Sequence, residues 1–459
     1  MGVNRPNLIY IYADALRYRS IGYNGDSQAK TPNIDMLAQC STVMDNCFSN
    51  HPLSSPYFAS LLTGKYTTST GIVINSLALN PKQKTISHIL TENGYNSEFI
   101  GRWRLSSKLI NSFIPEGESR QGFNSYFADF EFKRNHNQSR YTLDSKEKIK
   151  SEKYESDIQT DLAIERIEEN TKNHSPFALF LSYSLPGKHW GKKSVPEKYA
   201  DLFKDTEFSL PENYESANDP HSDLQALASK SKREKLNEFK KVYYAMVSNV
   251  DENIGRIMQK VVELGIDDNT IIVFTSNSGE MFGAHGRMGN NVFYDEAVRV
   301  PFIIRFSNKL SIGKNESCFG TVDIMPTLLS LMDIEIPRDV QGTDKSSYML
   351  TGTSDSGGQL LMGTGPADYF GPSKEWRAYR TKEFTYAVYK ADNEELLFDN
   401  LNDPYQTINL IYDKDYIDIG KKIKDEMYAE MAEINDTFEK NSYYKKNWIK
   451  NRKVIAELK

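Results

Sequence analysis

The chain has 459 residues, of which 39% are hydrophobic and 26% charged, and its formal net charge is −6 at pH 7. This composition is typical of a globular protein, and the length predicts one large domain plus a smaller one. The negative charge argues against nucleic-acid binding, and no apolar run of about 18 residues predicts a membrane span. We therefore expect neither a nucleic-acid nor a membrane partner, and the oligomeric state stays open.

The ends and the cysteines bear on the compartment. The chain starts so close to its first predicted strand that no signal peptide fits, which predicts a cytoplasmic protein or a secreted one whose signal peptide has been removed. Cys40, Cys47 and Cys318 form no Cys-x-x-Cys pair. We expect free thiols, with a Cys40–Cys47 disulfide as the alternative.

Apolar runs alternate with helical patterns along most of the chain. Leu8–Tyr12 has the length and composition of a buried strand, and a Thr-Pro-Asn start predicts a helix over Ile34–Cys40. Buried strands that alternate with helices predict an α/β fold, with a large, mostly parallel sheet covered by helices on both faces. Further strands are predicted at Phe177–Tyr183, Thr270–Thr275 and Pro301–Arg305, and further helices at about Ser145–Thr171 and Glu238–Leu264.

The chain changes character after about Thr351, where a Gly/Ser stretch to Gly358 has the pattern of a linker. Beyond it we expect a smaller α+β domain with an antiparallel sheet, so the predicted domains are residues 1–355 and 356–459. Its predicted elements are strands at Arg377–Tyr389 and Glu395–Phe398 that form a hairpin, a helix at about Lys414–Glu439, and a surface helix or tail over Tyr443–Lys459.

Two polar residues directly follow predicted strands. Asp14 comes after the first strand and Asn277 after the strand at Thr270–Thr275. In open α/β sheets, ligands bind beyond the carboxyl ends of the strands. We therefore expect both side chains to line one crevice.

Eight segments stand out between residue 5 and about residue 410: RPNLIYIYADAL, TPNIDMLA, SSPYFASLLTGKYTTSTGI, GRWRL, NTIIVFTSNSGEMFGAHG, YDEAVRVPFIIR, VDIMPTLLSL and LFDNLNDPYQTINL. Together, and in this order, they resemble the sulfatase family of the alkaline-phosphatase superfamily. The resemblance implies the sulfatase fold, with a sheet sandwiched by helices and a crevice that in active members hydrolyses sulfate esters.

The resemblance also places the metal site. Active members bind calcium through two adjacent acids after the first strand and two residues after the TS dipeptide, which correspond here to Asp14, Ala15, Asn277 and Ser278. Calcium prefers several oxygen ligands and benefits from anionic charge. Because only Asp14 keeps a carboxylate, we expect no metal and no other cofactor, and calcium only if the chain is a conventional sulfatase.

The region around the family's nucleophile also lacks residues that active members use. Active members carry a Cys or Ser that is oxidised to formylglycine, and Ser54 stands at that position. Phe58 replaces the arginine that maturation and catalysis use. An unmodified serine needs a base or a metal to become a nucleophile. We therefore expect formylglycine to be absent, and Ser54 has an alternative role as a helix N-cap.

Residues that bind sulfate in the family are replaced as well. The lysine and histidine of GKWHL correspond to Arg102 and Arg104, the PHxP histidine to Gly187, and a later lysine to Asn290. Because a buried unpaired carboxylate is costly, we expect an arginine (Arg17, Arg102 or Arg104) to fill the calcium position and pair with Asp14. The candidate ligand-binding residues are Arg17, His51, Ser54, Tyr57, Arg102, Arg104, His189, Asn277 and His285. The alternative for each is a structural role, which we favour for His285.

Three functions remain open at this point. The first is a sulfatase-fold protein without sulfatase activity that binds a partner or an anionic ligand, such as an anionic small molecule or a sulfated sugar. The second is an enzyme with metal-independent chemistry in the same pocket. The third is an active sulfatase or phosphatase, which the replaced residues argue against. No other catalytic motif competes with these.

Overall fold

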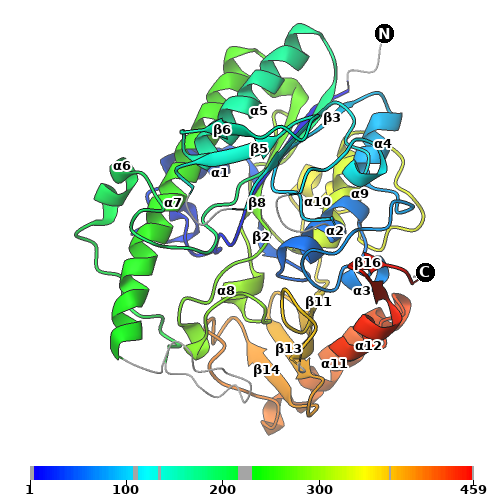
Figure 1. Ribbon diagram of the computed structural model, residues 1–459. Helices are drawn as coiled ribbons and strands as arrows, with labels where there is room; N and C mark the ends of the chain where they lie inside the picture. The colour runs from blue at the N-terminus through cyan, green and yellow to red at the C-terminus, as the bar shows by residue number, and fades with distance from the viewer. Residues whose placement is uncertain (1–4, 107–111, 133–135, 215–229, 372–373, 457–459) are drawn as a thin grey trace.

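The computed structural model describes residues 5–106, 112–132, 136–214, 230–371 and 374–456, and its largest element is a ten-stranded sheet (Figure 1). In sheet order the strands are β10 (Gly313–Gly320), β2 (Thr42–Phe48), β9 (Phe302–Phe306), β8 (Thr270–Ser276), β1 (Asn7–Ala13), β7 (Phe177–Ser182), β3 (Asn96–Gly101), β4 (Tyr126–Phe130), β5 (Ser139–Thr142) and β6 (Ile149–Ser151).

The middle of this sheet is parallel. β1 pairs in parallel with β7 and β8, β7 with β3, and β3 with β4, whereas β9 runs antiparallel to both of its neighbours. The predicted α/β fold with a mostly parallel sheet is confirmed. Parallel pairing brings the carboxyl ends of β1, β7 and β8 to one edge, where the candidate site lies.

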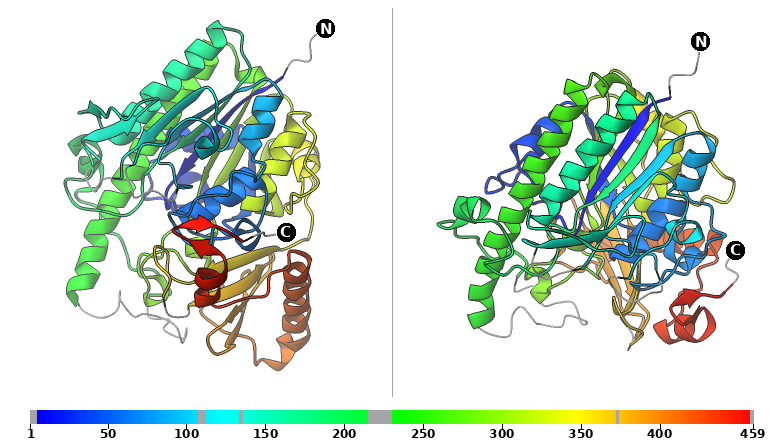
Figure 2. Two further views of the ribbon diagram at one scale, coloured as in Figure 1. Left: turned by 45° about the vertical axis from the view of Figure 1, so that its right-hand side comes forward. Right: turned by 45° about the horizontal axis from the view of Figure 1, so that its top comes forward.

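Helices cover both faces of the sheet (Figure 2). The side chains of β1 alternate between the two cores, with Ile9 and Ile11 on one side and Leu8 and Tyr10 on the other. Helices α1 (Pro32–Gln39), α5 (Glu155–Lys172) and α7 (Lys230–Glu263) cover the first face, and α2 (Ser54–Thr63), α4 (Ile86–Glu92) and α9 (Thr321–Leu331) cover the second. Because each face is buried, the strands carry almost continuous apolar runs.

A second, antiparallel sheet follows in the order β11 (Gln359–Thr364), β12 (Glu375–Arg380), β13 (Phe384–Tyr389) and β14 (Glu395–Asp399). One face packs on α11 (Ile417–Glu433). The other packs on residues in and around α8 (Asp295–Val298), which belongs to the main domain. The C-terminal antiparallel sheet is thus confirmed. The domain boundary predicted at residues 355–356 stays a prediction, and it falls between α10 (Ser346–Thr351) and β11.

The chain ends in α12 (Asn441–Asn447) and a hairpin of β15 (Ile449–Lys450) and β16 (Lys453–Val454). This terminal hairpin lies against the segment after α3 (Thr67–Thr70), where Lys453 forms a β-bridge with Ala78 (Figure 2, left). Residues 443–456 are therefore a helix and a docked hairpin instead of a free tail.

Some predicted elements have different limits. Residues 149–151 form β6, because the polar segment before α5 has no apolar stripe and pairs with β5. The predicted strand over Arg377–Tyr389 divides into β12 and β13 at a polar turn, in which the Phe384 amide donates to the Thr381 hydroxyl (2.9 Å). Helix α11 ends before Asn435, whose φ of 58° is typical of a residue just after a helix.

The cysteines are free thiols, so the alternative Cys40–Cys47 disulfide is not formed. Among the helices of the described residues, none has the apolar stretch that a bilayer crossing requires.

Candidate functional site

The site begins where β1 and β8 end side by side. Ala13 pairs with Ser276 in the sheet, so the next residues, Asp14 and Asn277, come together. The Asn277 amide nitrogen donates to the Asp14 carboxylate (Oδ1, 2.7 Å), while its Oδ1 accepts from the Ala15 amide (3.0 Å). Asp14 and Asn277 therefore meet at one edge of the sheet, as their positions after the strands predicted.

Ser54 completes this meeting point from the first turn of α2. Its hydroxyl lies 3.5 Å from Asp14 Oδ1 and 3.4 Å from Asn277 Nδ2. The N-cap of α2 is Leu53, so the alternative role of Ser54 as an N-cap is wrong. The hydroxyl instead faces the carboxylate, which is where the resemblance placed the nucleophile position.

Arg104 is the arginine that approaches the carboxylate. Its guanidinium lies 3.9 Å from Asp14 Oδ2, and the two side chains are 24% and 22% exposed. We call Asp14, Ser54, Arg104 and Asn277 the Asp14 cluster. The cluster pairs one negative charge with one positive charge, both partly exposed.

Of the three arginines named as possible partners of Asp14, the other two make different contacts. Arg17 lines a narrow separate cavity with Asp295 and Arg299. Arg102 is 5% exposed and donates to Glu155 Oε2 (2.9 Å), so its charge is matched inside the protein. Arg102 is therefore not exposed to a ligand.

Arg102 belongs to a buried group of residues that packs next to Arg104. Glu155 is the first residue of α5 and also contacts His136 Nδ1 (3.2 Å). Burial raises the pKa of Glu155, but Arg102 and His136 outweigh it and lower the pKa to about 2. Both guanidinium groups lie over the Phe132 ring, at 4.9 Å for Arg102 and 5.9 Å for Arg104. No sequence motif marked Glu155, His136 or Phe132, because their contacts join segments far apart in the chain.

Tyr57 and Phe58 are core residues. Tyr57 is 1% exposed and its hydroxyl contacts that of Tyr10 (2.8 Å), so the prediction that it binds a ligand is wrong. Phe58 packs on Phe99 and Trp103, with ring centroids 5.6 Å and 5.3 Å away. The Phe58 side chain therefore adds apolar surface to the core.

Two of the three candidate histidines are buried. His51 is 1% exposed, its Nδ1 lies 3.1 Å from the Thr67 hydroxyl, and burial lowers its pKa to about 3. His285 is buried and stacks on Tyr294 with centroids 3.7 Å apart, which agrees with a structural role. His51 and His285 are therefore not ligand contacts. His189 meets the edge of Phe132 at 5.7 Å and remains beside the crevice.

Gly187 and a chain of hydrogen-bonded side chains lie next to the Asp14 cluster. A β-carbon at Gly187 would lie 2.8 Å from Asp14 Oδ2, so no side chain fits there. Asn290 donates to Ser278 Oγ (2.7 Å), and Ser278 donates to Asn277 Oδ1 (3.1 Å). Asn290, Ser278 and Asn277 thus form one hydrogen-bonded chain that ends at Asp14.

A groove of about 390 Å³ opens beside these residues and is lined by cationic side chains. Lys188 follows Gly187 directly, and Asn290 belongs to the polar chain above, so the groove adjoins the Asp14 cluster. We call it the cationic groove. Its charged lining residues are Lys188, Arg287 and Lys374, with Asn290 and Tyr369 among the others and no carboxylate. No sequence motif marked Lys188, Arg287, Tyr369 or Lys374, because the groove joins segments that are far apart in the chain.

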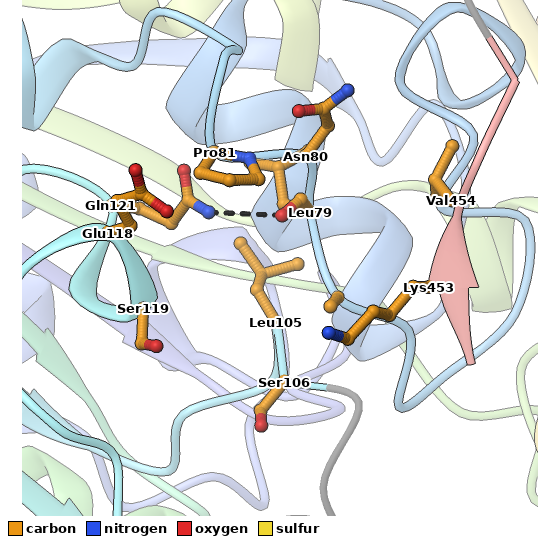
Figure 3. Close-up of a pocket in the computed structure, with 11 residues that line it drawn as sticks. Leu79, Asn80, Pro81, Leu105, Ser106, Glu118, Ser119, Gln121, Lys453 and Val454 are labelled. Atoms are coloured by element: carbon orange, nitrogen blue, oxygen red, sulfur yellow. Dashed lines mark hydrogen bonds between the residues drawn. The ribbon is translucent and has the colours of Figure 1, made fainter. Parts of the chain in front are cut away.

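Another cavity, of about 300 Å³, lies between the terminal hairpin and residues 78–81 (Figure 3). Lys453 extends from β16 toward Leu105, and the Gln121 side-chain amide donates to the Leu79 carbonyl (3.1 Å). One lysine and one acid, Glu118, line it, so it carries no excess of positive charge. The cationic groove is the better match for an anion.

Comparisons with known proteins agree with this architecture. The sulfatase family profile matches residues 6–334, and a profile described as N-sulphoglucosamine sulphohydrolase, C-terminal, matches residues 283–433. The ulvan-active sulfatase of Formosa agariphila is 32% identical over 453 residues, which is 97% of this chain and 84% of the relative. The N-acetylglucosamine-6-O-sulfatase of Bacteroides thetaiotaomicron is 27% identical over 506 residues, covering 96% of this chain and 84% of the relative.

Solved structures are similar over nearly the full length. A candidate sulfatase of Bacteroides fragilis, yidJ, has a TM-score of 0.84 at 27% identity, covering 97% of this chain and 98% of the other. A protein solved in complex with its substrate D-glucosamine-2-N,6-O-disulfate has a TM-score of 0.82 at 24% identity, covering 94% and 99%. The profile match, the relatives and the shared fold all point the same way, and the chain belongs to the sulfatase family.

Proposed function

We propose that this chain binds a sulfated sugar or a similar anionic carbohydrate in the crevice of the Asp14 cluster, without calcium- and formylglycine-dependent hydrolysis. The observation that carries the proposal is the approach of Arg104 to Asp14 at 3.9 Å. In this arrangement a guanidinium supplies the positive charge for which the family uses a metal. A guanidinium also presents forked donors that suit sulfate and carboxylate groups.

The donor set around Asp14 is a poor match for calcium, which takes about six to eight oxygen ligands in proteins. Asp14 supplies the one carboxylate of the cluster, and Asn277 Oδ1 is already engaged by the Ala15 amide (3.0 Å). No group of three or more His, Cys, Asp or Glu residues that could hold a metal ion occurs in the described part of the chain. A nearby guanidinium would also repel a dication.

Sulfate ester hydrolysis is the alternative, and the names of the relatives favour it. The contact of the Ser54 hydroxyl with Asp14 Oδ1 (3.5 Å) is the feature that such chemistry would use. Against it, Phe58 places an aromatic ring in the core where active members carry an arginine. The chemistry of a sulfatase depends on groups that act as a unit, so partial replacement costs most of the rate.

The proposal is tested with the purified full chain. We expect no turnover of aryl sulfate or phosphate esters with or without calcium, manganese or zinc, and an unmodified Ser54 by peptide mass spectrometry. We also expect calorimetric binding of sulfated monosaccharides. Metal-dependent turnover that Ser54→Ala abolishes, and that Ser27→Ala at an exposed serine leaves intact, would overturn the proposal in favour of hydrolysis.

A further inference from the structure

We propose that the cationic groove binds a second anionic group of the ligand, so that the site selects carbohydrates with two anionic groups. The inference rests on the proposed function, because it assigns a ligand class to the same crevice. The inference also names the residues involved. Lys188 and Lys374 bind the second anionic group, and the Tyr369 ring packs against the sugar.

The balance of charge is the first argument. In the Asp14 cluster the charge of Arg104 faces that of Asp14, so this part of the crevice has no net charge. The described residues that line the groove, in contrast, include three cations and no carboxylate. Lys188 and Lys374 are exposed, and neither makes an ion pair with a described residue. Arg287 lies deeper, 8% exposed, with its guanidinium 3.4 Å from the Tyr389 hydroxyl.

Glu280 is the acid beneath the groove, and it does not cancel this charge. Its carboxylate accepts the Gly289 amide and is completely buried. Burial raises the pKa of Glu280 and so favours its neutral form, although Lys188 acts in the opposite direction. The exposed ammonium groups therefore remain available to a ligand in the groove.

Continuity with the Asp14 cluster is the second argument. Lys188 is the neighbour of Gly187, whose α-carbon packs on Asp14. Asn290 lines the groove and connects through Ser278 to Asn277 by hydrogen bonds of 2.7 Å and 3.1 Å. A volume of about 390 Å³ lies within the usual range of small-molecule pockets. The groove and the Asp14 cluster therefore share neighbouring residues, as a ligand that contacts both requires.

The chemical class follows from the aromatic residue. Tyr369 lines the groove and is 62% exposed, which is an unusual position for a large aromatic ring. An exposed ring next to cations offers an apolar face to a sugar and charge to its substituents. Tyr369 and Lys374 come from the β11–β12 connection, opposite residues 287–292 of the main domain, so both domains would hold the ligand.

The test compares matched ligands on the full chain by calorimetry at one salt concentration. The ligands are glucosamine 6-sulfate, glucosamine 2-N-sulfate and glucosamine 2-N,6-O-disulfate. We expect the disulfate to bind at least tenfold more tightly than either monosulfate. In Lys188→Gln and Lys374→Gln this preference should fall to less than threefold, with monosulfate affinity changed by less than twofold. Tyr369→Ala should weaken all three ligands.

Lys382→Gln is the matched control, since Lys382 is an exposed lysine of the same domain that pairs with Glu316 outside the groove. Equal affinity for the monosulfates and the disulfate, or a preference unchanged in both lysine variants, would overturn the inference while leaving the proposed function intact. Failure of all three ligands to bind would instead remove the proposed function, and the inference with it.

Discussion

Asp14 and Gly187 depend on each other at the scale of single residues. The glycine leaves the space that the Asp14 carboxylate occupies, since a β-carbon would lie 2.8 Å from Oδ2. With that space open, Asp14 reaches Asn277 on one side and Arg104 on the other. The position of the Asp14 carboxylate therefore depends on a glycine at residue 187.

Replacing Arg104 tests this residue most directly. In Arg104→Met we expect ligand affinity to fall at least tenfold, because the guanidinium is the cation nearest to Asp14. The free energy of unfolding should fall by only about 0.5 kcal/mol, because the pair is loose and partly exposed. Calorimetry and urea denaturation check the two effects, with Arg140→Met on the exposed side of β5 as the control. Unchanged affinity would contradict the role of Arg104.

The buried carboxyl group of Asp129 predicts that the free energy of unfolding depends on pH. Burial raises its pKa to about 7, against the opposing effects of the Trp103 amide, which donates to it (2.9 Å), and of Arg104 and Arg102. The folded protein therefore holds a proton that the unfolded chain releases near pH 4, and the free energy of unfolding falls as the pH rises from about 4 to about 7.

Asp129→Asn keeps the acceptor for the Trp103 amide and removes the ionisation. We expect the variant to gain about 2–3 kcal/mol relative to the wild type between pH 5 and pH 8, measured by urea denaturation. Asp144→Asn, at a carboxylate that is 67% exposed, is the control. Parallel pH profiles for the wild type and Asp129→Asn would show that Asp129 does not contribute.

At the scale of elements, the start of α2 is held by segments distant in sequence. Asn75 Oδ1 accepts the Ser55 amide (3.0 Å), while Ser55 Oγ donates to the Arg104 carbonyl (2.7 Å). The Asn75 side-chain amide donates to Asp368 (3.2 Å), next to Tyr369 of the cationic groove. Arg452 of the terminal hairpin donates to the Asn75 carbonyl (3.2 Å). One asparagine thus connects the Asp14 cluster, the groove and the end of the chain.

Asn75→Ala should therefore affect stability and binding together. We expect the free energy of unfolding to fall by about 1–2 kcal/mol, since the variant loses the acceptor at the start of α2 and leaves polar groups unpaired. Ligand affinity should fall at least threefold, because Ser54 and Arg104 are less well positioned. Arg452→Ala should show a smaller effect of the same kind, and Lys450→Ala on the same hairpin should show none. Loss of stability without loss of affinity in Asn75→Ala would contradict the connection.

At the scale of the whole molecule, an ion pair connects the two sheets next to the groove. Arg380 of β12 donates twice to the Asp295 carboxylate of α8 (2.9 Å and 2.9 Å), which ties the second sheet to the main domain. The groove lies between loops of these two parts. A fragment that ends near residue 355 would therefore lack half of the lining, so every binding experiment needs the full chain.

Much of this molecule follows from sequence alone, because the signals involved are local. Apolar runs such as Leu8–Tyr12 predict buried strands, and parallel pairing brings the residues after those strands to one edge, which is why Asp14 and Asn277 were expected to meet. Family segments in their usual order identified the fold for the same reason. The polar segment before α5 and the turn between β12 and β13 were misjudged, since pairing with a neighbouring strand decided their structure.

Only the tertiary structure decided the role of each charged side chain. Arg102 and Arg104 are almost adjacent and chemically identical, yet one is buried against Glu155 of α5 and the other faces Asp14. The cationic groove likewise joins Lys188 to Lys374 across the two domains. A strand is predicted by its own residues, whereas the partner of a charge depends on which distant segments pack around it and on how much water they exclude.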